Sequence, residues 1–124
     1  MTERKKILVV DDSSTARMLE QAALGRGTYD VVTAKDGAEA VVVARKEKPD
    51  LILMDVMMPK MNGFEAVRAI RASDEVKAVP VIMVTTRGEP VNVEEGFQSG
   101  CNDYVTKPVN TLELLSKVKN LLGQ

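Results

Sequence analysis

Four polar segments of this chain carry side chains that could do chemistry together. Each directly follows a short apolar run, and the four are Asp11-Asp12, Asp55, Thr85-Thr86 and Lys107. Carboxylate oxygens bind hard cations such as Mg²⁺, a threonine hydroxyl donates a hydrogen bond, and a lysine supplies positive charge. This combination suits phosphoryl transfer, which depends on positioning and on stabilising the charge around the phosphoryl group.

Asp55 is the expected nucleophile in this chemistry and would form an aspartyl phosphate. We expect Thr85 to donate a hydrogen bond to one phosphoryl oxygen and Lys107 to pair with another. Two carboxylates about 4 Å apart repel by about 4 kcal/mol at an effective dielectric constant near 20. A site that gathers Asp11, Asp12 and Asp55 therefore needs positive charge, which Lys107 and a bound Mg²⁺ would supply.

None of these segments is informative alone. An Asp-Asp pair after a strand is usually a helix cap or a turn, and the spacing from Asp55 to Pro59 is also typical of a turn. A lone Thr-Thr or Lys-Pro carries no signal. Their occurrence at successive strand ends, in order, on one short chain favours a site over coincidence.

Alternating strands and helices must position these residues. Continuous apolar runs of strand length, typical of strands covered on both faces, occupy 7–10, 51–54 and 81–84, and weaker strands are predicted at 29–33 and 103–106. Helices are predicted from Ser13 or Ser14 to Gly25, from Asp36-Gly37 to before Pro49, from Gly63 through Ile70, loosely over 90–99, and over 111–122. The first helix has Ala16, Leu19 and Ala23 at helical spacing, and the last has Leu112, Leu115, Val118 and Leu122 on one side.

The alternation predicts an α/β fold in one domain, residues 1–124. Right-handed crossovers favour a doubly wound, flavodoxin-like parallel sheet of five strands in the order 2-1-3-4-5, with five helices on its two faces. Strands about 4.8 Å apart would bring Asp11, Asp12 and Asp55 into one acidic pocket at the carboxyl edge. Thr85 would lie one strand from Asp55, and Lys107 two strands away, a gap of roughly 10 Å.

Composition excludes several classes of function. The 124 residues include no histidine and one cysteine, which excludes a structural zinc site, a Ser-His-Asp triad and an internal disulfide. The net charge of -1 argues against nucleic acid as a partner, and no apolar run reaches the roughly 20 residues of a membrane span. We therefore expect a cytoplasmic protein with neither nucleic acid nor membrane as a partner, and a structural role for Cys101.

The sequence resembles the receiver domains of two-component response regulators, including the single-domain chemotaxis type. The resemblance covers essentially the whole chain. It rests on VVDDS at 9–13, DLILMDVMMP at 50–59, MNG at 61–63, the strand at 81–84 with Thr85, and GCNDYVTKP at 100–108.

The resemblance implies that Asp55 accepts a phosphoryl group from a sensor histidine kinase or a small donor such as acetyl phosphate. It implies that Asp12, Asp55 and the backbone carbonyl of Met57 bind Mg²⁺, with Asp11 acting closely or through water. Thr85 and Tyr104 would form a switch pair that remodels the face built from the fourth helix, fifth strand and fifth helix, which would bind a downstream protein. The Lys107-Pro108 bond is expected to be cis. Such a domain catalyses only its own phosphorylation and slow self-hydrolysis.

Three positions depart from the family pattern around the phosphoacceptor. Position 57 is Met where a polar residue is common in fast-cycling relatives, so self-hydrolysis is expected to be slow. Position 87 is Arg, and both positions flank the route of the attacking water. Thr86 stands where a smaller residue is frequent, which bears on how freely donors enter.

Other functions compatible with parts of the pattern are an aspartate-nucleophile phosphatase, a phosphate-independent docking module of the same fold, and a phosphorelay intermediate. The phosphatase would place its second Asp two residues after the nucleophile, whereas here Asp11 and Asp12 are adjacent and position 13 is Ser. The docking module would typically have lost a residue of the pocket. A flavin-binding domain is disfavoured because no Gly- or Ser/Thr-rich phosphate loop follows the first strand.

Overall fold

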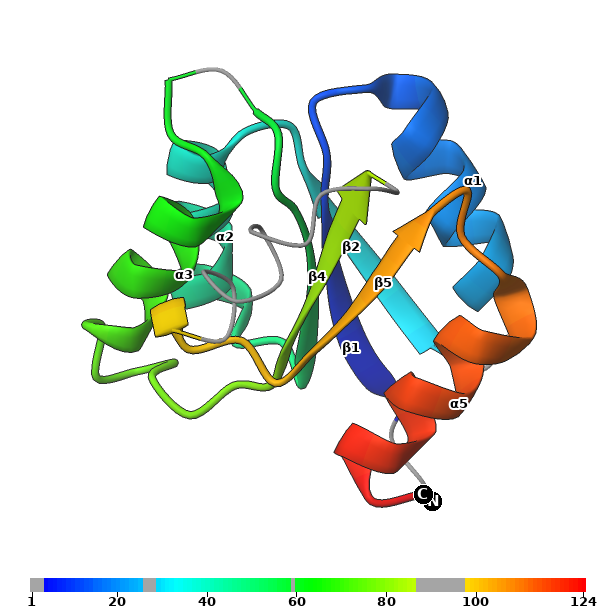
Figure 1. Ribbon diagram of the computed structural model, residues 1–124. Helices are drawn as coiled ribbons and strands as arrows, with labels where there is room; N and C mark the ends of the chain where they lie inside the picture. Colours follow the sequence, from blue (N-terminus) through cyan, green and yellow to red (C-terminus); the bar gives the residue numbers. More distant parts are fainter. Residues whose placement is uncertain (1–3, 26–28, 59, 87–97) are drawn as a thin grey trace.

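The computed structural model describes residues 4–25, 29–58, 60–86 and 98–124. Its centre is a five-stranded sheet in which all pairings are parallel and the order is β2-β1-β3-β4-β5 (Figure 1). The strands are β1 (Lys5–Val10), β2 (Tyr29–Ala34), β3 (Leu51–Asp55), β4 (Val81–Thr86) and β5 (Asp103–Lys107). The predicted strand order is confirmed.

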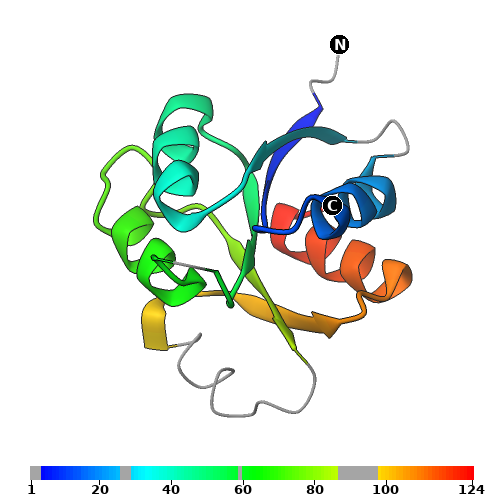
Figure 2. The same cartoon turned by 90° about the horizontal axis from the view of Figure 1, so that it is seen from above.

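Helices cover both faces of this sheet. They are α1 (Ser14–Leu24), α2 (Gly37–Glu47), α3 (Gly63–Arg71) and α5 (Thr111–Leu122). Figure 2 shows α2 and α3 on one face and α1 and α5 on the other. Five helices were predicted and the described residues contain four; the loose helix expected over 90–99 falls almost entirely on 87–97, outside the described residues.

Each of these helices begins at a polar N-cap that follows a loop at the carboxyl edge of the sheet. The side-chain oxygens of Ser13, Asp36, Asn62 and Asn110 each accept a hydrogen bond from a backbone N–H three residues later. At α3 the cap is reciprocal, because the Glu65 carboxylate also accepts from the Asn62 backbone N–H. The caps fix where each helix starts relative to the strand ends that carry the site.

The core divides into two layers because side chains alternate across each strand. In β1, Leu8 and Val10 pack toward α2 and α3, whereas Ile7 and Val9 pack toward α1 and α5, and all four are fully buried. Continuing this alternation places Asp11 toward α1 and α5. The apolar runs were therefore correctly interpreted as strands buried on both faces.

The predicted apolar stripes of the first and last helices are wrong in part. Leu112 is 80% exposed, whereas Val118 is buried as predicted, together with Leu114, which lies outside the predicted stripe. Likewise Leu19 is 65% exposed, and α1 buries Leu24 together with a glutamate. Both helices are rich in apolar residues, so several stripes at helical spacing were available and the packing against the sheet decided between them.

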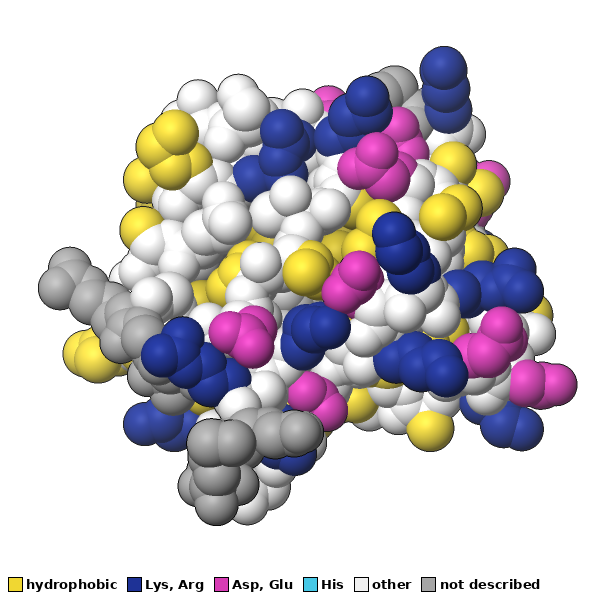
Figure 3. All heavy atoms as spheres, turned by 180° about the vertical axis from the view of Figure 1, so that it is seen from behind, with side chains coloured by type: hydrophobic (Ala, Val, Ile, Leu, Met, Phe, Trp, Pro, Cys, Tyr) yellow, Lys and Arg dark blue, Asp and Glu magenta, His cyan; other side chains and the backbone are white. Residues whose placement is uncertain are grey.

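The molecular surface carries mixed charge. On the face opposite to the view of Figure 1, Lys and Arg side chains lie among Asp and Glu side chains (Figure 3). In the part of the chain that the structure describes, no helix is both long and apolar enough to cross a membrane. Cys101 is buried beside the α2–α3 layer, and burial raises the pKa of its thiol to about 11, which favours the expected structural role.

Candidate functional site

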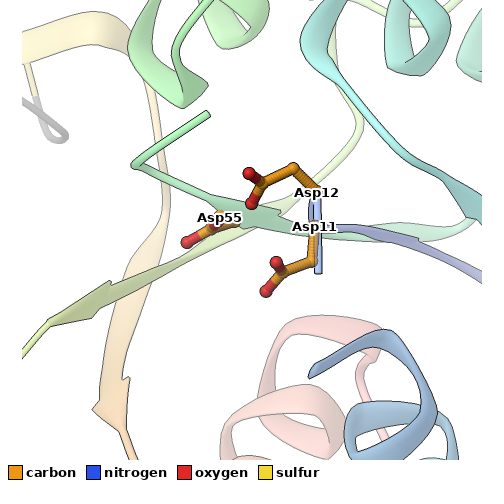
Figure 4. Close-up of side chains that lie close together, drawn as sticks. All are labelled: Asp11, Asp12 and Asp55. Carbon is orange, nitrogen blue, oxygen red and sulfur yellow. The ribbon is translucent and has the colours of Figure 1, made fainter. Parts of the chain in front are cut away.

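Three aspartates meet at the carboxyl edge of the sheet, as predicted. Asp11 follows β1, Asp55 ends β3, and the parallel register that pairs Val10 with Met54 brings these two residues side by side. One carboxylate oxygen from each of Asp11, Asp12 and Asp55 lies within 4.8 Å of the others. Figure 4 shows Asp11 on the side of the sheet that faces α1 and α5, with Asp12 on the other side.

Local hydrogen bonds hold Asp11 in place. Its backbone N–H donates to the Ala34 carbonyl at 3.2 Å, which continues the β1–β2 pairing past the end of the strand. One carboxylate oxygen accepts from the Ser13 backbone N–H at 2.9 Å, and the Asp11 carbonyl accepts from the Arg17 guanidinium at 2.6 Å. The Asp-Asp-Ser segment thus forms both the end of the pocket and the cap of α1.

Lys107 reaches across β4 to the aspartates. Its Nζ lies 3.0 Å from Oδ2 of Asp11 and 3.3 Å from Oδ1 of Asp55. The extended lysine therefore crosses the whole of the two-strand gap. The Lys107-Pro108 peptide bond is cis, as the resemblance implied.

Burial and mutual repulsion govern the electrostatics of the pocket. Asp55 is 4% exposed, and burial together with the charge of Asp11 raises the pKa of its carboxyl to about 6, against the opposing effect of Lys107. Burial acts to lower the pKa of Lys107, but its hydrogen bond to Asp11 and the charge of Asp55 outweigh this and raise it. At neutral pH the site thus holds a charged lysine and a largely ionised Asp55.

Thr85 and Tyr104 lie on the same face of the sheet. Thr85 follows Val84, which pairs with Asp55, and is 2% exposed. Tyr104 pairs with Met83, two residues before Thr85, so both side chains point toward the layer of α2 and α3. Thr85 lies at the carboxyl end of this face, next to the aspartates. The half-buried Tyr104 lies farther from the aspartates, toward the amino ends of the strands.

The loop after β3 joins the site directly to α3. A Cβ at Gly63 would clash with the backbone carbonyl of Asp55, so glycine allows the start of α3 to pack against the end of β3. The Gly63 backbone N–H donates to the Val56 carbonyl at 2.9 Å. Between them, the Met57 side chain is 61% exposed. Arg87 and the side chain of Thr86 lie outside the described part of the structure.

Sequence reasoning missed one residue of this region, Glu20. It is on the inner face of α1, 3% exposed, and neither oxygen of the ionised carboxylate has a hydrogen-bond donor. Burial and the nearby charge of Asp11 raise the pKa of this carboxyl to about 8, and the protonated carboxyl can donate a hydrogen bond to Asp11. The signal available in the sequence was a glutamate four residues before Leu24, a spacing that places both on one helix face.

Comparisons with known proteins agree with this geometry. The family model described as the response regulator receiver domain matches residues 7–119. Protein PilH of Pseudomonas aeruginosa is 41% identical over 118 residues, which cover 95% of this chain and 98% of PilH. The chain spans about half the length of several other curated relatives that it matches.

Solved structures show the same fold. Chemotaxis protein CheY4 of Vibrio cholerae is 38% identical with a TM-score of 0.89, and the match covers 96% of this chain and 99% of that one. The receiver domain of the sensor histidine kinase PA1611 from Pseudomonas aeruginosa, which has a magnesium ion coordinated in its active-site cleft, is 33% identical with a TM-score of 0.90, covering 98% and 100%. The chain therefore belongs to the response regulator receiver domain family of two-component signalling.

Proposed function

We propose that this receiver domain accepts a phosphoryl group on Asp55, with Mg²⁺ held by Asp11, Asp12 and Asp55, and passes the change to a protein partner. The observation that carries the proposal is the convergence of three carboxylates and the Lys107 ammonium at the carboxyl edge of the sheet. A structural ion pair would need one carboxylate for one lysine. Here Lys107 contacts both Asp11 and Asp55, and Asp12 lies beside them.

The donor set fits a hard divalent cation. Two oxygens on an octahedral Mg²⁺ lie about 3 to 4 Å apart, given metal–oxygen distances of about 2.1 Å, and oxygens of the three aspartates lie within 4.8 Å of one another. With all three aspartates ionised, the pocket carries three negative charges, and a dication would offset two of them. Asp11, Asp12 and Asp55 would hold the ion, Asp11 directly or through water, and the Met57 carbonyl remains a predicted protein ligand. The magnesium in the PA1611 receiver supports this assignment by similarity.

The transfer step follows from the chemistry of Asp55. One of its carboxylate oxygens attacks the phosphorus, the new P–O bond forms, and the bond from phosphorus to the donor's histidine nitrogen or acetate oxygen breaks. When bound, the cation would offset negative charge on the phosphoryl oxygens. Lys107 would pair with one phosphoryl oxygen and the Thr85 hydroxyl would donate to another. Because these groups act once per phosphorylation and on the chain itself, the domain is a switch and has no separate substrate to turn over.

Transmission would run along the sheet face shared by Thr85 and Tyr104. Movement of the Thr85 hydroxyl toward the phosphoryl group would open space beside Met83, the residue paired with Tyr104. The Tyr104 ring is half-buried and could turn into this space. The altered surface would lie over β5 and α5, with the expected fourth helix completing it outside the described residues.

Partners and compartment follow from the same reasoning. We propose a sensor histidine kinase as the donor and a protein target as the receiver of the signal, with no nucleic acid bound by this domain, since its net charge is -1. A single cysteine fits a reducing compartment, which supports the cytoplasm as the place of exchange. A phosphate-independent docking module is disfavoured because the three aspartates, Lys107 and Thr85 are all in place.

The proposal is tested by intact mass after incubation with acetyl phosphate. We expect a single phosphoryl adduct on the natural chain with Mg²⁺, and no adduct without Mg²⁺ or in Asp55→Asn. The matched control is Asp74→Asn, which removes a fully solvated aspartate (93% side-chain exposure) from the other end of the sheet and should leave the adduct unchanged. An adduct that persists in Asp55→Asn would refute the assigned acceptor.

A further inference from the structure

Glu20 is the one buried polar side chain of this region that the proposed transfer step does not use. Among the described residues, its two carboxylate oxygens are the only buried side-chain oxygen or nitrogen atoms without a hydrogen-bond partner. Native structures seldom leave such groups unpaired, and an exception calls for an explanation. The next buried residue of α1 is Leu24, so packing alone would favour an aliphatic side chain at position 20.

Glu20 and Lys107 line the same cavity. The cavity has a volume of about 270 Å³ and lies between α1 and the segment that leads into α5. Its walls are otherwise small or apolar except for Thr111, and they include Leu19 and Pro108. Lys107 is therefore the one basic residue that lines this cavity, and Glu20 is the one acidic residue.

The present position of Lys107 conflicts with a cation on the aspartates. Its Nζ lies 3.0 Å from Asp11 and 3.3 Å from Asp55, on two of the three carboxylates that would hold the ion. A dication on the same carboxylates would repel the ammonium across a few ångströms of largely buried space. Lys107 has a long flexible side chain that is one-third exposed, so it can move, and it needs an acceptor to move to.

We propose that Glu20 is a positioning residue for Lys107, whose ammonium moves from Asp11 and Asp55 toward the Glu20 carboxylate when a divalent cation occupies the three aspartates. The inference rests on the cation site of the proposed function and adds to it a change in the ion-pair partner of Lys107. In the metal-free domain Lys107 pairs with Asp11 and Asp55, and Glu20 has no cationic partner. In the cation-loaded domain the ion offsets two of the three aspartate charges in place of Lys107, and the buried pair forms between α1 and β5.

The test is a double-mutant cycle on Mg²⁺ affinity, measured by calorimetric titration of the whole domain with MgCl₂ at one fixed pH. We expect Glu20→Gln to weaken Mg²⁺ binding by about five- to tenfold, and Glu20→Leu to do the same, because both remove the acceptor. In a Lys107→Met background, which has no ammonium to relocate, Glu20→Gln should change the affinity by less than about twofold.

Four further outcomes have a defined meaning. Unchanged or tighter Mg²⁺ binding in Glu20→Gln overturns the proposal, and so does an equal loss in both backgrounds, which would show that Glu20 acts by charge alone. Asp12→Asn separates the two proposals. If Asp12→Asn abolishes Mg²⁺ binding while Glu20→Gln does not weaken it, the cation site is supported and the movement of Lys107 to Glu20 is refuted. If the natural chain binds no Mg²⁺, both proposals are refuted.

Two controls keep the result interpretable. Glu113→Gln removes a half-exposed carboxylate from the first turn of α5 and should leave the Mg²⁺ affinity within about twofold of the natural chain. Thermal unfolding without metal tests folding directly: Glu20→Gln should melt no lower than the natural chain, because Glu20 has no cationic partner in that state and a glutamine amide can still donate a hydrogen bond to Asp11. A large drop in melting temperature would show that Glu20 has an ion-pair partner in the metal-free domain.

Discussion

Helices α1 and α3 both start at the pocket, yet the residues on their buried faces differ in polarity. The inner face of α3 is wholly apolar, with Phe64, Ala66, Val67 and Ile70 buried beside Gly63. The inner face of α1 buries only Leu24 and the unpaired Glu20. Packing explains the residues of α3, whereas packing disfavours Glu20. The contrast suggests that α3 is mainly the rigid support of the phosphoacceptor loop, and that α1 takes part in the charge balance of the site.

The largest expected effect is the loss of the apolar support under α3. Phe64→Ala should destabilise the domain by about 3 to 5 kcal/mol, because it removes a buried aromatic side chain and leaves a cavity. Urea unfolding monitored by circular dichroism measures this. A loss below about 1 kcal/mol would show that α3 packs more loosely than its burial indicates.

Gly63 links that support to the site. Gly63→Ala places a methyl group against the Asp55 carbonyl, which must shift, and overpacking of this kind costs about 1 to 3 kcal/mol. The rate of phosphorylation by acetyl phosphate should fall together with stability. A stable variant with a normal rate would mean that the close approach has no part in positioning Asp55.

On α1, by contrast, replacing the buried Glu20 should raise the stability of the domain. In the absence of metal, Glu20→Leu should stabilise the domain by about 1 to 3 kcal/mol at pH 8, because an unpaired buried polar group is replaced by an apolar one. Urea unfolding with and without Mg²⁺ checks the size and the metal dependence. Destabilisation without metal would place Glu20 among ordinary structural residues.

The pH dependence of metal-free stability sharpens the same comparison. The folded-state pKa values of Asp55 and Glu20 are raised to about 6 and about 8, so the folded state binds more protons than the unfolded state between about pH 4 and 8. Stability should therefore fall as pH rises through this window, by up to about 1.4 kcal/mol per pH unit for each group. Glu20→Leu should flatten the upper half of the curve. Unfolding curves that are flat from pH 6 to 8 in the natural chain would contradict the raised pKa of Glu20.

The smallest effect on the fold is expected at Met57, outside both helices. Its side chain is 61% exposed, so Met57→Asn should change stability by less than about 0.5 kcal/mol. If the bulky side chain hinders the attacking water, the phosphoryl lifetime should shorten several-fold in this variant, as followed by decay of the adduct mass. An unchanged lifetime would remove Met57 from the account of slow hydrolysis.

The sheet and the three aspartates could be predicted because each depends on a local signal. Continuous apolar runs marked the buried strands, and a parallel sheet brings strand ends such as Asp11 and Asp55 to one edge. The helix faces could not be fixed in the same way. In α1, Leu19 and Leu24 both suit an apolar stripe, and only contact with the sheet shows that Leu24 is buried and Leu19 exposed.

Glu20 was missed for a related reason. Its burial beside Lys107 depends on residues 87 positions apart in the chain. The spacing to Leu24 places both residues on one face of α1, but it does not show that this face is turned toward the site. Lys107 was expected to act in the site across a gap of roughly 10 Å, but strand spacing gives only the distance between backbones, and the contact with Asp55 at 3.3 Å depends on the path of the side chain.

Borohydride trapping would show whether the Asp55 carboxylate itself becomes phosphorylated. Borohydride reduces an acyl phosphate to an alcohol, so a phosphorylated aspartate is converted to homoserine and can be located by peptide mass spectrometry. After incubation with acetyl phosphate and Mg²⁺, we predict homoserine at position 55 and unmodified Asp11 and Asp12. Homoserine at position 11 or 12, or an adduct that borohydride does not convert, would contradict the account.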